Sequence, residues 1–223
     1  MVPFSFAGEE LLLAAANALY WPRERALLVA DLHLEKASFY ARFGQLLPPY
    51  DSRETLGRLA DAVRQTVARR VFCLGDNFHD TGGADRLEPH AAGMLAALTR
   101  ATDWVWIAGN HDQGRIPGGT AVEELELAGV ILRHEAVPGE VRPELSGHFH
   151  PKLKVTARGR RVVRHCAVVS ERKLILPAFG ALTGGMDAAD PAIIAAMQPA
   201  RAVDALLGVS GKLLQFPLWR AAA

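Results

Sequence analysis

The 223-residue chain is predicted to be an α/β protein with two sheets packed face to face and helices on the outside. Two observations predict this class. In the first half, short apolar runs alternate with helical patterns, which is typical of a mainly parallel sheet covered by helices. In the second half, short strands follow one another through turns that contain Gly and Pro, which indicates a largely antiparallel sheet. Since no linker separates the halves, we expect a single domain over residues 1–223.

The composition excludes several classes of protein. Half of the residues are apolar and 22% are charged, so the chain can build a core and is not of the disordered class. No window approaches the ~18 uninterrupted apolar residues that a membrane span needs. The apolar run 11–16 follows Glu9 and Glu10, where a secretory signal would carry positive charge. The two cysteines, Cys73 and Cys166, are too few for a disulfide framework. We therefore expect a cytoplasmic protein without a membrane partner.

Three buried strands are predicted in the first half, each ending at a polar residue or a glycine. They are residues 26–30, 71–74 and 104–108. Between them, Asp51 is predicted to be a helix N-cap because Glu54 follows it three residues later. Apolar residues at helical spacing then predict a helix over about 52–68, and a second helix is expected over about 88–100.

The second half is predicted to be built of short strands. These are residues 130–134, 144–147, 152–157, 161–169 and 173–177. Near the end of the chain, residues 203–217 are predicted to form a short helix or strand followed by a closing strand over 212–216.

Residues of the kinds that bind metals follow the predicted strands. In chain order they form the motifs Asp31-Leu32-His33, Gly75-Asp76, Gly109-Asn110-His111-Asp112, the single His134, and Gly147-His148-Phe149-His150. Ligands of α/β sheets bind beyond the carboxyl ends of strands, so we expect these side chains to converge. In Asp-x-His and His-x-His, alternate residues lie on the same side of an extended chain. Carboxylate and imidazole donors without thiolates favour Mn²⁺, Fe or Zn²⁺ over a structural zinc site.

The number of donors predicts two divalent metal ions, and Asp76 could bridge them. Two dications and two carboxylates leave a charge of about +2, which attracts a phosphate group and lowers the pKa of a water between the ions. Such a pair stabilises both the attacking and the leaving oxygen of a displacement at phosphorus. His79, which is next to Asp80, is a candidate for substrate contact or for support of the ligands, whereas His90 and His165 are expected outside the centre.

The order of these motifs resembles the calcineurin-like metallophosphoesterase superfamily. The resemblance implies a four-layer α-β-β-α sandwich, with two mixed sheets and helices on the outer faces. It also implies the ligands of the two metals, which are Asp31, His33, Asp76 and His150 for one and Asp76, Asn110, His134 and His148 for the other. His111 would approach the scissile phosphate without binding a metal, and would protonate the leaving oxygen or stabilise the transition state. Asp112 would orient His111.

A narrower resemblance extends over most of the chain. The strings that carry it are VADLHLEKASF (29–39), LLPPYDSRETL (46–56), CLGDNFHD (73–80), WVWIAGNHD (104–112), LRHE (132–135), SGHFHP (146–151), RGRRVVRHC (158–166) and LPAFGALTGGMD (176–187). They are similar to the bacterial ligase-associated DNA damage response endonuclease family. This implies a Mn²⁺-dependent phosphodiesterase and DNA endonuclease acting in DNA repair on single-stranded or damaged DNA, in functional association with a DNA ligase and a helicase. Asn77 and Gln113 depart from the pattern, where serine and proline are expected, but neither is a proposed ligand.

A basic segment at residues 152–173 fits a nucleic-acid substrate. It holds eight cations and one anion, although the whole chain has a net charge of only +1. Strand alternation places Arg158, Arg160 and Arg164 on one face and Arg161 on the other. The first three are therefore our candidates for contacts with DNA phosphates. The alternative is an exposed strand whose charges prevent edge pairing.

The string at 176–187 contains glycines, which allow a backbone to approach a ligand closely. Phe179, Thr183, Gly184 and Gly185 are therefore expected either to form a loop near the site or to form an ordinary tight turn.

Two other functions are compatible with the same metal centre. A phosphodiesterase or phosphatase acting on a small nucleotide is one, because the metals contact only the phosphate group. A non-catalytic scaffold of the same fold is the other. It is disfavoured because such scaffolds typically lose the catalytic histidine or some ligands, and this chain keeps them all.

Overall fold

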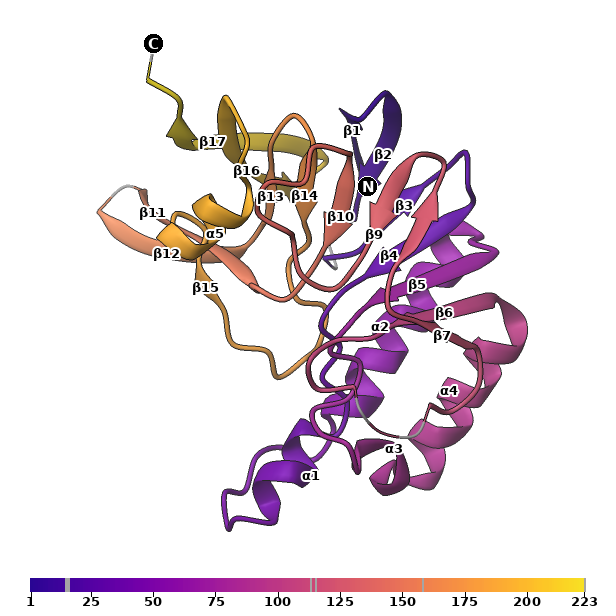
Figure 1. Ribbon diagram of the computed structural model, residues 1–223. Coiled ribbons are helices and arrows are strands. Elements are labelled where there is room, and N and C mark those ends of the chain that lie inside the picture. Colours follow the sequence, from indigo (N-terminus) through magenta and orange to yellow (C-terminus); the bar gives the residue numbers. More distant parts are fainter. Residues whose placement is uncertain (15–16, 113, 115, 158, 223) are drawn as a thin grey trace.

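The computed structural model describes residues 1–14, 17–112, 114, 116–157 and 159–222. Two seven-stranded sheets pack face to face, and a smaller three-stranded sheet lies beside the second (Figure 1). The helices are α1 (Lys36–Ala41), α2 (Asp51–Thr66), α3 (Gly83–Arg86), α4 (Pro89–Ala101) and α5 (Pro191–Ala196). None of the helices in the described part of the chain is long and apolar enough to cross a membrane.

The first sheet changes from antiparallel to parallel pairing at β4. In spatial order its strands are β1 (Val2–Phe6), β2 (Glu9–Leu13), β3 (Leu19–Trp21), β4 (Ala26–Val29), β5 (Arg70–Leu74), β6 (Asp103–Ile107) and β7 (Thr120–Val122). The pairs from β1 to β4 are antiparallel, and those from β4 to β7 are parallel. The carboxyl ends of β4, β5 and β6 therefore meet at one edge, where the motifs of the metal type begin.

The second sheet is mixed. In spatial order its strands are β17 (Lys212–Arg220), β16 (Ala202–Val209), β13 (Ala167–Val169), β14 (Lys173–Ile175), β10 (Glu144–Ser146), β9 (Val130–Leu132) and β8 (Leu125–Leu127). The small sheet contains β12 (Arg160–His165), β11 (Pro151–Ala157) and β15 (Met186–Asp187). Strand β10 is parallel to both of its neighbours, β9 and β14, and the other pairs of the large sheet are antiparallel.

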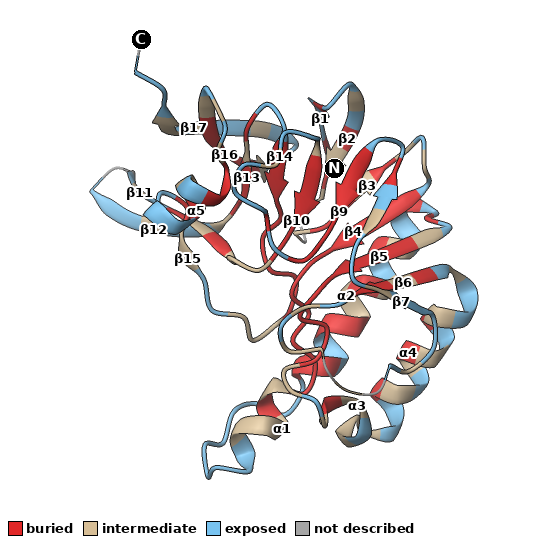
Figure 2. Ribbon diagram, in the orientation of Figure 1, coloured by how far each residue is buried: buried red, intermediate tan, exposed pale blue. Residues whose placement is uncertain are grey.

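Both faces of the central strands are buried, which explains their continuous apolar sequences. In β4, Leu28 packs between the two sheets, whereas Leu27 packs under the helices. In β5, Phe72 packs between the two sheets, and Cys73 packs under the helices. Helices α2 and α4 cover the outer face of the first sheet, and buried residues line the whole interface between the sheets (Figure 2).

These layers confirm the predicted α/β class with two mixed sheets. The outer layer on the second sheet is thin, because α5 is the only helix of the described residues that packs there. Ile193 of this helix is fully buried against Val203 and Ala205 of β16.

The largely antiparallel pairing expected in the second half is confirmed for most strand pairs, but two details differ. Strand β10 is parallel to its neighbours, because long connections carry the chain back before each pairing. The strand expected over 161–169 divides at Cys166, whose amide donates to the carbonyl of Pro151 (3.1 Å). Residues before Cys166 pair in the small sheet, and those after it pair in the large sheet.

Other differences concern single elements. Strands β1, β2 and β3 were not predicted. Of the alternatives for residues 203–217, the strand is confirmed, since β16 is followed by the closing strand β17. The predicted N-cap is also wrong, because Tyr50 occupies that position and Asp51 is the first helical residue. The Asp51 carboxylate instead accepts a hydrogen bond from the amide of Ala37 (3.1 Å), which ties α1 to α2.

Candidate metal centre

The loops that follow β4 and β5 are joined by backbone hydrogen bonds. The amide of Asp31 donates to the carbonyl of Gly75 (3.1 Å), and the amide of His33 donates to that of Asp76 (2.9 Å). From the second sheet, the amide of His148 donates to both oxygens of the Asp31 carboxylate, at 3.0 Å each. The centre is therefore assembled from both sheets.

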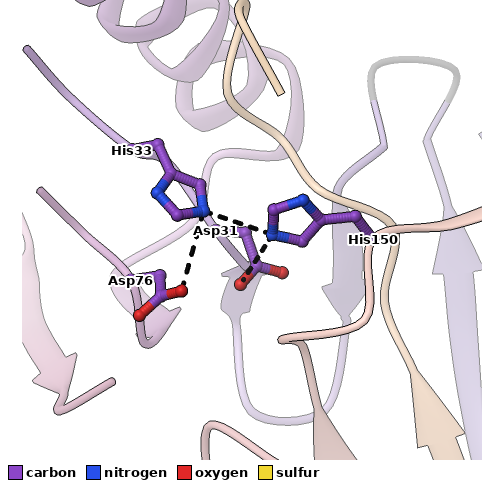
Figure 3. A group of neighbouring side chains, drawn as sticks. All are labelled: Asp31, His33, Asp76 and His150. Carbon is purple, nitrogen blue, oxygen red and sulfur yellow. Dashed lines mark hydrogen bonds and ion pairs between the residues drawn. The ribbon is translucent and has the colours of Figure 1, made fainter. Parts of the chain in front are cut away.

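A first cluster contains Asp31, His33, Asp76 and His150, which offer donor atoms within 4.8 Å of one another (Figure 3). The Nε2 atoms of His33 and His150 are 3.2 Å apart. His33 Nε2 lies 3.6 Å from Asp76 Oδ2, and His150 Nε2 lies 3.4 Å from Asp31 Oδ1. The donors thus face a common point, and two carboxylates beside two imidazoles suit a divalent cation.

Burial, together with the neighbouring charges of His150 and Lys36, lowers the pKa of His33 to about 2. The ring is therefore neutral at physiological pH. A neutral imidazole is the form that binds a metal ion, so His33 can accept one without losing a proton.

A second cluster contains Asp76, His134 and His148. His134 Nδ1 lies 3.0 Å from the carbonyl of Leu74, to which it donates, and this contact fixes the ring orientation. The Nε2 atom then faces Asn110 Oδ1 (3.0 Å), His148 Nδ1 (3.0 Å) and Asp76 Oδ1 (3.4 Å). Asn110 therefore adds a fourth oxygen or nitrogen donor to this cluster.

Asp76 belongs to both clusters, and its two oxygens face different donors. Oδ2 faces His33 of the first cluster, and Oδ1 faces His134 of the second. Its side chain is only 4% exposed. A buried carboxylate between two donor sets has the geometry required of a ligand that bridges two ions.

The backbone is strained at this centre. Five of the donor residues have positive φ angles between 43° and 73°, a backbone region that is uncommon for residues other than Gly and in which Asn, Asp and His are enriched. They are Asp31, His33, Asp76, His148 and His150. Such strain costs about 1–3 kcal/mol at each residue and gathers at functional sites.

Glycines of the motifs make room for the donor side chains. A Cβ atom at Gly109 would overlap the backbone nitrogen and the carboxylate of Asp76. At Gly75, whose φ is +79°, it would overlap the ring of His134. These positions require glycine because a ligand side chain occupies the space of the Cβ atom.

His111 lies beside Asp76 but outside both clusters. Its Nε2 atom is 3.9 Å from Asp76 Oδ2, and its amide donates to Asp76 Oδ1 (3.1 Å). The Nδ1 atom lies 2.9 Å from the carbonyl of His79, to which it donates. The side chain is 38% exposed, so Nε2 can reach a substrate placed over the centre.

The expected role of Asp112 in orienting His111 is corrected by these contacts. In the described part of the chain, no hydrogen bond joins the Asp112 carboxylate to the His111 ring. The carboxylate accepts instead from the amides of Asn77 (2.9 Å), Phe78 (3.2 Å) and Gly109 (2.9 Å), because it is turned toward the loop after β5. Asp112 thus positions two motifs relative to each other, and the His79 carbonyl holds His111.

The departure at Asn77 fits this arrangement. Its Nδ2 atom donates to Asp112 Oδ2 (2.8 Å) and to the carbonyl of Ile107 (3.0 Å), so the longer amide side chain joins the same network. Gln113, the other departure, lies outside the described residues.

The string at 176–187 does lie beside the centre. The amide of Phe179 donates to the carbonyl of Ala30 (2.9 Å), and that of Gly180 donates to the carbonyl of Asp31 (3.1 Å). A Cβ atom at Gly185 would overlap the side chain of Lys152 and the carbonyl of His150.

Sequence reasoning missed Arg58, which reaches this loop from α2. Its guanidinium donates to the carbonyl of Phe179 and lies over the Phe179 ring. Burial, Lys152, His150 and Arg58 together lower the pKa of His165, so positive groups gather beside His150. The sequence of α2 offers only its apolar and cationic residue types as a signal for the position of Arg58, and these types are equally common on any helix.

The register of the basic hairpin places Arg160 and Arg164 on one face and Arg161 on the other, as predicted. Lys152 pairs with His165, and Leu153 pairs with Arg164. Directly opposed residues share a face, so Arg160 and Arg164 lie on the face of Leu153 and not on the face of His165. Arg158 lies outside the described residues. Lys173, which was counted in the basic segment, is fully buried and paired with Glu144 (3.4 Å).

Two packed sheets carry two clusters of carboxylates and imidazoles at their strand ends, and the clusters share Asp76. This arrangement defines a metal-dependent hydrolase. Residues 24–158 match the calcineurin-like phosphoesterase family. The chain belongs to this family, and it is a metallophosphoesterase that acts on phosphoric ester bonds.

Comparison with solved structures finds a nuclease. The chain is 32% identical to the nuclease MPE of Pseudomonas putida, with a TM-score of 0.72 over 97% of this chain and 98% of that chain. The phosphoesterase Yfce of E. coli is 13% identical, with a TM-score of 0.41 over 86% of this chain and 98% of that chain. Comparison with curated proteins gives no match.

Proposed function

We propose that the protein is a phosphodiesterase with two metal ions and that its substrate is DNA, which it cleaves as an endonuclease. The observation that carries this proposal is the position of Asp76. It faces a donor cluster on either side and lies 3.9 Å from the exposed ring of His111. The similarity to a nuclease over 97% of the chain supports the choice of substrate.

The proposed ligands divide between the two ions. Asp31, His33, Asp76 and His150 would hold one of them. Asp76, Asn110, His134 and His148 would hold the other. When bound, two divalent ions supply Lewis-acid activation of the phosphate and acidify a water molecule.

His111 is the proposed proton donor to the leaving oxygen. Its Nδ1 atom is committed to the His79 carbonyl, so the proton must come from Nε2 of the charged imidazolium. That charge also stabilises the phosphorane-like transition state. Asp112 supports this step only indirectly, since it fixes the loop that carries His111.

Finer properties follow from the family resemblance and are part of the same proposal. The ion would be Mn²⁺, and the enzyme would act in DNA repair in the cytoplasm, in functional association with a ligase and a helicase. Arg158, Arg160 and Arg164 would contact DNA phosphates at a distance from the metal centre. The face of the hairpin that carries Lys152 and His165 is closer to His150 and would contact phosphates next to the cleavage point.

The test compares a chromogenic phosphodiester with a circular single-stranded DNA, each with Mn²⁺ and with a chelator. We expect Mn²⁺-dependent hydrolysis of the diester and opening of the circle. Hydrolysis of the diester alone would move the substrate to a small nucleotide. Failure on both, with metals shown to be bound, would refute the proposal and favour the scaffold.

A further inference from the structure

We propose that a row of aromatic side chains in and beside α1 is a subsite that stacks a base of the substrate strand. The row consists of Phe39, Tyr40, Phe43 and the ring of His79, and we call it the aromatic row. The inference rests on the proposed nucleic-acid substrate and adds a binding site to it.

The aromatic row begins at the proposed proton donor. The rings of His111 and His79 are stacked, with centroids 5.5 Å apart and planes at 15°. The ring of Tyr40 stacks on His79 in turn (5.5 Å, 29°), and Phe39 meets His79 edge to face at 4.8 Å. Phe43 extends the row from Phe39 at 5.2 Å. Aromatic surface therefore runs without interruption from the reacting centre to the outside of the molecule.

The outer end of the row is open to solvent. Phe43 is 67% exposed, and every residue from 41 to 50 is exposed, including the apolar Leu46 and Leu47. Helix α1 and the loop after it project away from the two sheets (Figure 1), and the loop is exposed along its length (Figure 2). A contiguous exposed apolar patch of this kind marks a binding surface.

The base of the row is held rigidly. Glu35 precedes α1, and its amide donates to the hydroxyl of Ser52 (2.9 Å), which donates to the Glu35 carboxylate (2.7 Å). The Asp51 carboxylate binds the amide of Ala37 (3.1 Å), and Arg86 donates to the hydroxyl of Ser38 (3.0 Å). These contacts preorganise the rings next to the metal centre, which lowers the entropy cost of binding.

A nucleobase is the occupant that this chemistry fits. Each phosphate of a strand is flanked by a base, so a phosphate placed at His111 brings a flanking base to the neighbouring rings. Stacking accepts every base because each has a π-face, which suits an enzyme without base-specific contacts. The exposed guanidinium of Arg42, in the same segment, lies 3.6 Å from the Asp80 carboxylate and could exchange this partner for a backbone phosphate.

The test measures steady-state kinetics on an oligonucleotide and on a chromogenic phosphodiester that carries no nucleobase. For Phe43→Leu, which keeps the apolar volume but removes the π-face, we expect the ratio of kcat/KM on the oligonucleotide to that on the small diester to fall. The expected fall is about five- to hundredfold, the effect of losing one base–aromatic stack. The fall in the ratio should come from a higher KM for the oligonucleotide. Phe43→Trp, which keeps an aromatic ring, should keep the ratio of the unaltered protein. Leu214→Ala, an exposed apolar residue of β17 at the far end of the molecule (Figure 1), is the matched control.

An equal effect of Phe43→Leu and Leu214→Ala on the ratio would overturn the proposal. So would a fall in the ratio accompanied by a change in molecular mass by light scattering, because the patch would then be an interface between copies of the chain. Mn²⁺-dependent hydrolysis of the small diester tests the proposed function separately, so the two proposals can fail independently.

Discussion

The side chains at the centre differ in what they contribute. Asp76 is shared by both donor clusters, whereas His111 touches Asp76 but belongs to neither. In the proposed mechanism, metal binding and proton transfer therefore depend on different residues, and single substitutions should separate them.

Replacement of His111 by Ala is expected to leave two metals bound and to lower kcat about 10²–10⁴-fold, the usual range for a lost general acid. The reason is that both donor clusters are complete without this ring. Turnover of a chromogenic phosphodiester and metal content per chain measure the two effects. Unchanged turnover would exclude the role assigned to His111.

Replacement of Asp76 by Ala is expected to abolish turnover and metal binding together, because one change removes a donor from each cluster. Asp80→Ala is the matched control. Asp80 is a nearby carboxylate that pairs with Arg86 and lies outside both clusters, so this variant should keep its metals. If Asp76→Ala still bound two ions, Asp76 would not be their bridge.

Single residues also show which contacts could be predicted from the sequence and which could not. The spacing of the motifs was sufficient to predict that Asp31 and Asp76 converge, because the ends of β4 and β5 meet at one edge of the first sheet. It could not show that the carbonyl of His79 holds the ring of His111, since a backbone contact leaves no residue preference. The contact expected between the Asp112 carboxylate and the His111 ring was predicted wrongly for the same reason, because the carboxylate and the ring each bind a backbone group instead.

At the scale of elements, the loop after β6 should tolerate very little change. A Cβ atom at Gly109 would overlap Asp76, so Gly109→Ala is expected to lower metal affinity by at least tenfold. Gly93→Ala is the control, because Gly93 lies in α4 with nothing near its missing Cβ atom, and alanine there should stabilise the helix by about 1 kcal/mol. Titration with Mn²⁺ measures the affinities. Equal affinities in the two variants would refute the steric account.

The buried side chain of Lys173 stabilises the thin outer layer of the second sheet. Its ammonium donates to the carbonyls of Val137, Ala196 and Gln198 and pairs with Glu144. Lys173→Met should lower the free energy of unfolding by about 3–5 kcal/mol, because the buried Glu144 charge then keeps only Arg133 (3.5 Å) of its two cationic partners.

Urea denaturation measures this loss. Lys173→Met with Glu144→Gln should recover part of it, because no unpaired charge then remains. The exposed Lys212 provides the control, since Lys212→Met should change the free energy of unfolding by less than about 0.5 kcal/mol. A similar loss in both single variants would show that Lys173 has no special structural role.

Elements with a strong local pattern were predictable, and those defined by distant pairing were not. The helix α2 and the strands β4, β5 and β6 have apolar periodicity or buried runs that depend on local sequence. The separation of the β11–β12 hairpin from the large sheet depends on where Cys166 pairs, which is a non-local choice. The strands β1, β2 and β3 are only three to five residues long and were not predicted, although Gly8 and Pro22 lie in the turns between them and β4.

At the scale of the whole molecule, the centre exists only when both sheets are packed together. Asp31 and Asp76 follow strands of the first sheet, and His134 and His148 follow strands of the second. One continuous core joins the sheets, which supports the proposal that residues 1–223 act as a single domain. The family resemblance implied this arrangement, but the aromatic row and the position of Arg58 depend on packing that no motif encodes.

The most direct test of a two-metal phosphodiesterase is to titrate the metal-free protein with Mn²⁺ while recording turnover of a chromogenic phosphodiester. Because Asp76 joins the two clusters, we predict that activity appears only as the second equivalent binds and saturates at two ions per chain. Full activity after one equivalent, or activity that persists in the presence of a chelator, would contradict this account of the centre.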